Sequence, residues 1–304
     1  LVGSEMCIRD RFYYNRDSAI DSPDDEKAFY WLKLAAEQGH CEAQYSLGRK
    51  YSEDKSRHKD NEQAIFWLKK AALQGHTFAS NALGWILDRG EDPNYKEAVA
   101  WYQIAAESGM SYAQNNLGWM YRNGNGVAQD YALAFFWYKQ AALQGHSYAQ
   151  DNLADLYEDG KGVAQNKTLA AFWYLKSAQQ GNRHAQFQIA WDYNAGEGVD
   201  QDYKQAMYWY LKAAAQESVG AYVNIGYMYK HGQGVEKDYQ AAFEWFMKAA
   251  ECNDATAWYN LAIMYHYGEG RPVDLRQALD LYRKVQASGT RDVSQEIREI
   301  EDLL

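Results

Sequence analysis

The sequence predicts an all-helical solenoid of stacked antiparallel helix pairs, with about seven full repeats of ~36 residues and partial repeats at both ends. Three observations predict it. An Ala-x-x-Trp pattern returns at steps of 36 or 34 residues, a glycine follows most of these anchors by eight residues, and a second apolar-periodic segment comes after the glycine. Two helices joined by so short a turn lie antiparallel to each other.

The first helix of each repeat, called helix A, carries an alanine three residues before its anchor, so that both face one side of the helix. The anchors are Trp31, Trp67, Trp101, Trp137, Trp173, Trp209, Trp245 and Leu281, and the alanines are Ala28, Ala64, Ala98, Ala134, Ala170, Ala206, Ala242 and Ala278. We expect the anchors to form the core. Replacing Trp137 or Trp173 by alanine should then cost about 3–5 kcal/mol.

The turn after helix A has the residue type that ends a helix in the left-handed region at least cost. These turn residues are Gly39, Gly75, Gly109, Gly145, Gly181 and Gly289. Asn253 tolerates the same conformation, whereas Glu217 does not do so readily, and we therefore expect the sixth turn to differ in shape. The second helix, called helix B, has Leu or Ile at 47, 83, 117, 153, 189, 225 and 261.

An Asp or Asn precedes each helix-A alanine by four residues, where it predicts a helix N-cap. These residues are Asp24, Asp60, Asn94, Asp130, Asn166, Asp202, Asp238 and Asp274, and most of them follow a GxGV loop. Gln63, Glu97, Gln205 and Gln277 stand three residues further on, and this spacing predicts capping boxes.

The two ends of the chain depart from the repeat. Residues 1–11 contain the string MCIRDR, which we interpret as a sequencing or cloning artefact, and residues 12–23 as the remnant of an upstream repeat. The solenoid is expected over 24–290 and a C-terminal capping helix over 291–304. On this interpretation the native N-terminus is missing, so that no targeting segment can be read.

The recurring pattern over roughly residues 24–290 resembles the Sel-one-like repeat family, which is related to tetratricopeptide repeats. This resemblance implies a right-handed α-solenoid that serves as a protein-interaction scaffold and binds its partner along a concave surface. It also implies a bacterial periplasmic or cytoplasmic location, or the endoplasmic reticulum lumen if the source is eukaryotic. It names no partner.

Composition narrows the function classes. A net charge of −10 disfavours a nucleic-acid partner, which needs a basic surface. No apolar run is long enough to span a membrane, and Cys7, Cys41 and Cys252 have no paired spacing. No catalytic motif stands in a suitable context, and the seven histidines show no metal-ligand spacing. We therefore expect no enzyme activity, no cofactor and no metal.

Helix A carries an unexpected row of rings on the side opposite its buried arc. With 100° per residue, the position before the anchor should be polar, but it holds Tyr30, Phe66, Phe136, Phe172 and Tyr208. Lysines at neighbouring offsets include Lys70, Lys139, Lys176, Lys212 and Lys248. We expect this aromatic and lysine ladder to line the concave groove and hold a peptide with acidic groups. Alternatively, neighbouring helices A cover the rings.

A second candidate is the asparagine before the helix-B leucine, at Asn116, Asn152, Asn224 and Asn260, which could clamp a peptide backbone or bond to the next repeat. The leading function is a non-enzymatic scaffold or adaptor that binds a partner protein or peptide. The alternatives are a regulatory or assembly subunit of a bacterial envelope enzyme complex, and glycan or small-molecule binding by the ladder.

Overall fold

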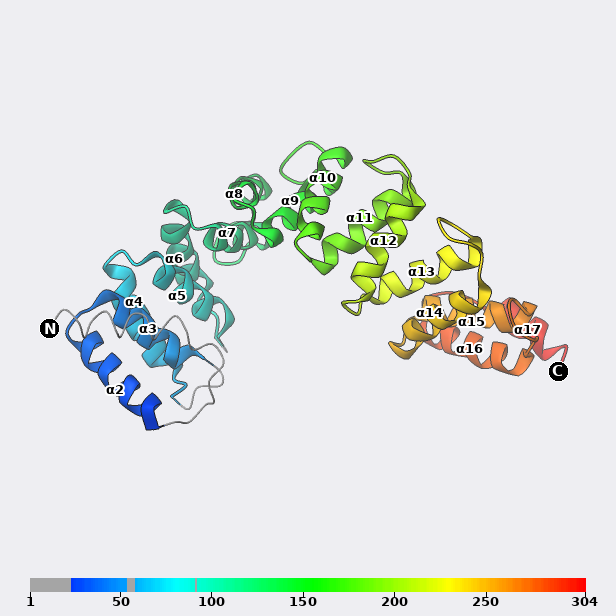
Figure 1. The fold of residues 1–304 in the computed structure, drawn as a ribbon, viewed down its shortest axis with the longest axis horizontal. Helices are drawn as coiled ribbons and strands as arrows, with labels where there is room; N and C mark the ends of the chain where they lie inside the picture. The colour runs from blue at the N-terminus through cyan, green and yellow to red at the C-terminus, as the bar shows by residue number, and fades with distance from the viewer. Residues whose placement is uncertain (1–22, 54–57, 91) are drawn as a thin grey trace. The chain divides into compact units, whose positions relative to one another are not determined.

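The computed structural model describes residues 23–53, 58–90 and 92–304, and within these ranges every regular element is an α-helix (Figure 1). The chain divides into two compact units, Leu1–Gln129 and Asp130–Leu304. The proposed artefact (1–11) lies outside the described residues, as does all of the upstream remnant (12–23) except position 23. No described helix is both long and apolar enough to cross a membrane.

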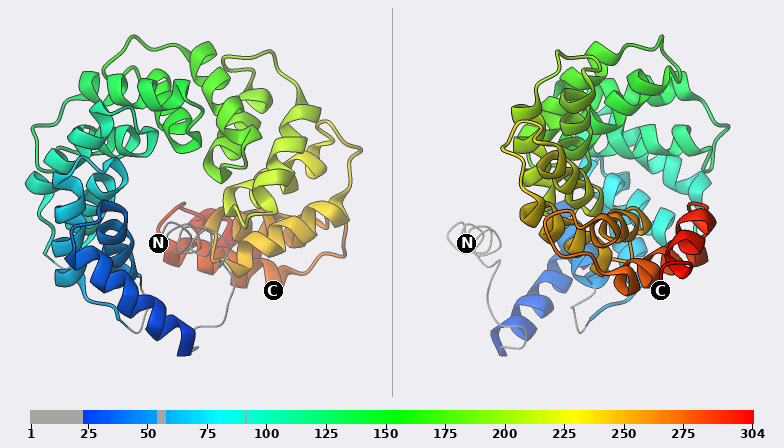
Figure 2. Two further views of the ribbon diagram at one scale, coloured as in Figure 1. Left: turned by 60° about the vertical axis from the view of Figure 1, so that its left-hand side comes forward. Right: turned by 90° about the vertical axis from the view of Figure 1, so that its right-hand side faces the viewer.

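The first unit alternates helices A (α2, α4, α6) with helices B (α3, α5, α7), each packed on its neighbours in the chain. Their bounds are α2 Pro23–Glu37, α3 Cys41–Ser52, α4 Asn61–Leu73, α5 Thr77–Arg89, α6 Tyr95–Glu107 and α7 Ser111–Asn123. Helix B α3 also contacts helix B α5. The order of stacking within the unit can be followed in Figure 2.

The second unit continues the alternation with helices A at even numbers and helices B at odd numbers up to α15. Its elements are α8 Tyr131–Leu143, α9 Ser147–Asp159, α10 Lys167–Gln179, α11 Arg183–Ala195, α12 Tyr203–Ala214, α13 Val219–His231, α14 Tyr239–Glu251, α15 Ala255–Tyr267, α16 Leu275–Ser288 and α17 Ser294–Glu301. Helix α17 stands where the next helix B would be, and it contributes Ile300 to a buried cluster with Tyr282 and Val285 of α16.

The N-cap prediction is confirmed at seven positions, because the side chains of Asp60, Asn94, Asp130, Asn166, Asp202, Asp238 and Asp274 all accept a hydrogen bond from a backbone N–H of the first turn. The side chain of Asp24 lies outside the described residues. The capping-box prediction fails for a clear reason. The N–H groups of cap residues such as Asp60 and Asp202 already donate to helix-B carbonyls, at Tyr51 and Tyr193. The cap residue therefore has no backbone N–H left for the Gln or Glu side chain, and Glu97 instead accepts from the side-chain Nδ2 of Asn94 at 3.1 Å.

The turns from helix A to helix B share one left-handed residue, with φ of 86–91° at Gly39, Gly75, Gly109, Gly145 and Gly181. The expectation of a different sixth turn is wrong. Glu217 adopts φ 61°, as Asn253 does, and its N–H donates to the Ala214 carbonyl as the glycines donate in their own turns. The packing of α12 on α13 thus imposes a conformation that glutamate adopts at some cost.

The residue after each predicted anchor is more deeply buried than the anchor itself. The anchors Trp67, Trp101 and Trp209 are buried, at 5–9% exposure, which confirms their assignment to the core. Trp137 and Trp173 are only partly buried and Trp31 is exposed, so the assignment is wrong for Trp31. The adjacent side chains are 0–1% exposed: Leu68, Tyr102, Tyr138, Tyr174, Tyr210, Phe246 and Tyr282. They pack on a small residue of the preceding helix B. A Cβ added to Gly84 would lie 2.8 Å from the Tyr102 ring. Helix B therefore approaches the next helix A too closely for a side chain there.

Buried glutamines connect the repeats by hydrogen bonds. Gln150 of α9 is 5% exposed, and its Nε2 donates to the Ala142 carbonyl while its Oε1 accepts from Nε2 of Gln180. Gln44 and Gln186 make the same pair of bonds in their own repeats. In each of these amides both the nitrogen and the oxygen have a hydrogen-bond partner, so neither atom is buried unsatisfied.

Candidate functional site

The five predicted rings of the ladder are partly solvent-exposed, between 46% and 58%, in both units. Each packs edge-on against the anchor tryptophan that follows it, with ring centroids 4.9–5.4 Å apart and interplanar angles of 74–82°. Neighbouring helices therefore do not fully cover the rings. The contact with tryptophan fixes the orientation of each ring while about half of its surface stays accessible.

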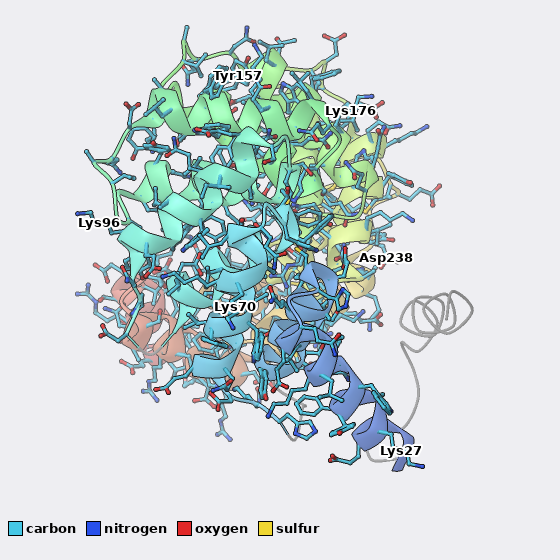
Figure 3. All side chains as sticks on the ribbon, turned by 90° about the vertical axis from the view of Figure 1, so that its left-hand side faces the viewer. Lys27, Lys70, Lys96, Tyr157, Lys176 and Asp238 are labelled. Atoms are coloured by element: carbon cyan, nitrogen blue, oxygen red, sulfur yellow. The ribbon has the colours of Figure 1, made fainter. Side chains whose placement is uncertain are left out.

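The ladder lysines lie over aromatic faces, but not all over the predicted ring. Nζ of Lys70, Lys176 and Lys212 lies 4.4, 5.6 and 5.5 Å from the ring centroid of Phe66, Phe172 and Tyr208, respectively. Figure 3 labels Lys70 and Lys176. Each of these pairs places a positive charge beside an exposed apolar surface.

Two lysines depart from this arrangement. Lys139 lies over Phe135 at 5.8 Å, and Lys248 over Trp245 at 4.0 Å, because Glu244 occupies the ring position of α14. The first unit holds Tyr30, Phe66 and Lys70, and its ladder is interrupted at Ala100 of α6. The second unit holds all the other ladder residues and the longer continuous part, from α8 to α12.

The candidate asparagines are largely engaged within the protein. Nδ2 of Asn224 and of Asn260 donates to the carbonyl four residues earlier in its own helix, and Nδ2 of Asn116 donates to Oδ1 of Asn81 in α5. Asn260 is almost fully buried. These contacts favour a packing role over a peptide clamp at the asparagines.

Sequence reasoning missed a second exposed surface, the helix-B face. We define it by the residues five before, two before and two after the helix-B Leu or Ile. In the first unit it includes Phe78 and Trp85 of α5 and Tyr112 and Trp119 of α7, all 42–62% exposed. Their signal in the sequence is the recurrence of aromatic residues five before and two after the helix-B Leu or Ile.

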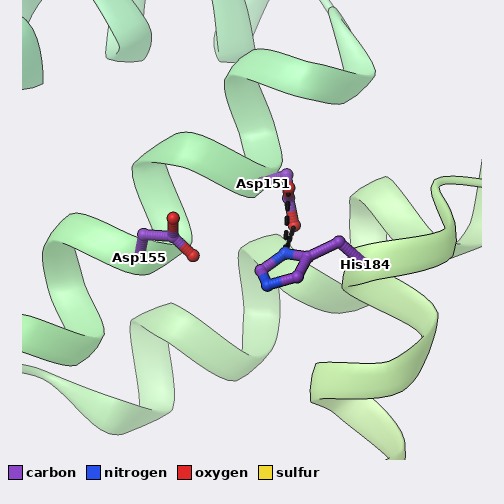
Figure 4. Close-up of side chains that lie close together, drawn as sticks. All are labelled: Asp151, Asp155 and His184. Atoms are coloured by element: carbon purple, nitrogen blue, oxygen red, sulfur yellow. Dashed lines mark hydrogen bonds and ion pairs between the residues drawn. The ribbon is translucent and has the colours of Figure 1, made fainter. Parts of the chain in front are cut away.

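The helix-B face changes character at α9 and α11. Asp151 and Asp155 lie one turn apart on α9, and Nδ1 of His184 from α11 is 3.0 and 3.1 Å from the two carboxylate oxygens of Asp151 (Figure 4). The Tyr174 hydroxyl donates to Oδ1 of Asp155 at 2.8 Å. One potential ligand atom from each of Asp151, Asp155 and His184 lies within 4.8 Å of the others. We call these three residues the α9/α11 cluster.

The electrostatics of the cluster follow from its burial. Burial raises the pKa of the Asp151 carboxyl, and hydrogen bonding to His184 partly opposes that rise. Burial also raises the pKa of Tyr174 and keeps it a neutral donor to Asp155. His184 itself is half exposed, with 53% of its side-chain surface accessible.

Outside this cluster, the carboxylate of Asp192 in α11 is also buried. Its Oδ2 has no hydrogen-bond partner among the described residues. Burial raises the pKa of Asp192 to about 7, repulsion from Glu158 adds to the rise, and Lys167 opposes it. Lys167 itself forms ion pairs with Glu158 and Glu197. This buried carboxylate could not be predicted from the sequence, because a helix-B aspartate is expected to be exposed.

These features define a tandem helical-repeat protein whose exposed positions carry aromatic and charged groups. The sequence pattern of the Sel1 repeat matches eight consecutive segments, and the chain belongs to this family. The matched segments are 11–40, 41–76, 77–110, 111–146, 147–182, 183–218, 219–254 and 255–284. Each fully described match begins with helix B and continues through the following helix A, except that the last match ends at 284 within α16.

Similar proteins agree with this assignment. The chain is 96% identical over 119 residues to the Sel1-repeat-containing protein YbeQ of Escherichia coli K12, a match covering 39% of this chain and 37% of that protein. It resembles the structure of c5321, a protective antigen of uropathogenic E. coli, with a TM-score of 0.80 and 35% identity over 86% of this chain and 56% of that one. A Sel1 repeat protein from Oxalobacter formigenes matches with a TM-score of 0.65 and 32% identity over 70% and 86% of the two chains.

Proposed function

We propose that this protein is a non-enzymatic scaffold that binds a partner protein or peptide on the aromatic and lysine ladder. Sel1 repeat proteins are generally protein-interaction scaffolds, which supports the class of function. The observation that carries the proposal is the recurrence of one arrangement on successive helices A: a half-exposed ring, braced edge-on by tryptophan, with a lysine over a ring of the same helix.

The physical properties of this arrangement suit peptide binding. A ring that is already fixed in orientation loses little conformational entropy when it is covered, so more of its burial contributes to affinity. The neighbouring lysines supply positive charge within a chain whose net charge is −10. We therefore propose a partner segment with apolar side chains spaced to meet successive rings and acidic groups that meet the lysines.

The second unit offers the sharper test because Phe136, Phe172 and Tyr208 lie on three successive helices A. Peptides would be selected from a displayed random library on the whole protein, with counter-selection on the Phe136→Ala/Phe172→Ala variant. We expect enriched sequences with acidic and apolar residues, and fluorescence anisotropy should show binding to the variant weakened at least about tenfold.

The control is Tyr148→Ala, which removes a still more exposed ring, 67% against 46–47%, from the helix-B face. Its affinity for the selected peptides should equal that of the wild type. Equal binding by the Phe136→Ala/Phe172→Ala variant, with its melting temperature unchanged, would refute the ladder as the binding surface. A thermal shift with saccharides that depends on the same two rings, and no enriched peptide, would instead favour glycan binding.

A further inference from the structure

We propose that Asp151, Asp155 and His184 form a binding site for a divalent transition-metal ion of the Zn²⁺ class, between helices α9 and α11. The first argument is geometric. The three potential ligand atoms lie within 4.8 Å of one another, and the ligands of a tetrahedral zinc ion, at 2.0–2.2 Å from the metal, lie about 3.3 Å apart. Small side-chain rotations therefore bring the three atoms to bonding distance.

The donor set favours this class of metal. An imidazole with two carboxylates suits Zn²⁺ and related ions, whereas Ca²⁺ and Mg²⁺ prefer oxygen ligands alone. His184 is half exposed, so water or a further ligand can reach the remaining coordination position. The Tyr174 hydroxyl donates to Asp155, as outer-shell partners do when they orient a ligating carboxylate.

The second, independent argument comes from the other repeats. At the position of His184, the preceding helix B of the same unit, α9, has Tyr148, and α7 and α5 of the first unit have Tyr112 and Phe78. The position of Asp151 holds an asparagine in α5 and α7, Asn81 and Asn115. The position of Asp155 holds a tryptophan in α5, α7 and α11, namely Trp85, Trp119 and Trp191. The stacking of helices thus does not require acids or histidine there, yet three ligand-type side chains occur together at one junction.

Charge supports the same conclusion. Two carboxylates one turn apart on a helix repel each other, and Asp151 is largely buried, with 13% of its side-chain surface accessible. The basic group that pairs with Asp151 is His184, whose Nδ1 lies 3.0 Å from Oδ1 of the carboxylate. A divalent cation would neutralise both carboxylates at once.

The test is isothermal titration of the metal-stripped full chain with ZnCl₂, together with visible absorption on adding Co²⁺. The variants Asp151→Asn and His184→Tyr insert residues that other repeats already carry at these positions, so the fold should persist, as thermal melting in EDTA would check. The matched control is His231→Gln, which removes an exposed histidine of the same unit.

We expect one Zn²⁺ to bind per chain in the wild type and in His231→Gln, and to raise the melting temperature of both. Each cluster variant should bind at least about tenfold more weakly and lose the Co²⁺ absorption bands. Absence of binding to the wild type, or equal affinity in the Asp151→Asn and His184→Tyr variants, would overturn the proposal.

Discussion

Helices α5 and α7 of the first unit and helices α9 and α11 of the second use equivalent exposed positions for different chemistry. The first pair presents Phe78, Trp85, Tyr112 and Trp119, whereas the second brings Asp151, Asp155 and His184 together. The buried positions hardly change between the pairs: Tyr102 follows α5 and Tyr174 follows α9, each essentially unexposed. Packing therefore fixes the inward residues of the repeat and leaves the outward ones available for function.

The largest expected effect tests the shared core. Tyr174→Ala and Tyr102→Ala should each lower the free energy of unfolding by about 3–5 kcal/mol, because each removes a fully buried ring. Chemical denaturation followed by circular dichroism would measure both. The control is Trp173→Ala, whose half-buried ring should cost clearly less. An equal or greater loss for Trp173→Ala would contradict the assignment of the core to Tyr174.

A smaller, pH-dependent effect separates two buried carboxylates. In α5 the Tyr102 hydroxyl donates to Asp88 at 2.7 Å, whereas Oδ2 of Asp192 in α11 lacks a partner. Because the pKa of Asp192 is raised to about 7 in the folded state from an ordinary value of 3.8, the folded state binds the additional proton. The stability of the wild type therefore falls as the pH rises between these two values.

Replacing Asp192 by asparagine removes the free-energy cost of ionising this buried carboxylate in the folded state. Asp192→Asn should be more stable than the wild type by roughly 1–3 kcal/mol at pH 8, and the difference should fade as the pH falls toward 4. Denaturation at a series of pH values measures it. Asp88→Asn is the matched variant and should give a smaller gain, since burial also raises the pKa of Asp88 but the hydrogen bond from Tyr102 and the charge of Arg89 oppose that rise. A constant difference across the pH range would show that Asp192 is not protonated on folding.

The smallest expected effect concerns the outward positions themselves. The double variant Asp151→Asn/His184→Tyr gives the α9/α11 cluster residues found in α7, and in EDTA its free energy of unfolding should stay within about 0.5 kcal/mol of the wild type. Thermal melting checks this. A large loss would mean that the cluster supports the stacking of α9 on α11 and that the two regions differ in structure as well as in surface chemistry.

Most of the fold could be predicted because its signals are local and repeat many times. The N-caps, the turn residues and the periodicity of both helices require only neighbouring residues, and the repetition averages out exceptions such as Glu217. The ladder rings were found in the same way, and the structure places them in partial exposure. The helix-B face was missed because its residues vary in type between repeats.

The sequence by itself determined the repeat, its helix pairs and the residues that begin and end each helix, since backbone hydrogen bonding and left-handed turns act over a few residues. Which of two adjacent rings is buried more deeply depends on tertiary packing. Trp173 and Tyr174 differ by about 100° around the helix, and the approach of helix B selects the tyrosine. The contact between His184 and Asp151, 33 residues earlier in the chain, also depends on tertiary structure, because it requires the stacking of successive helices B.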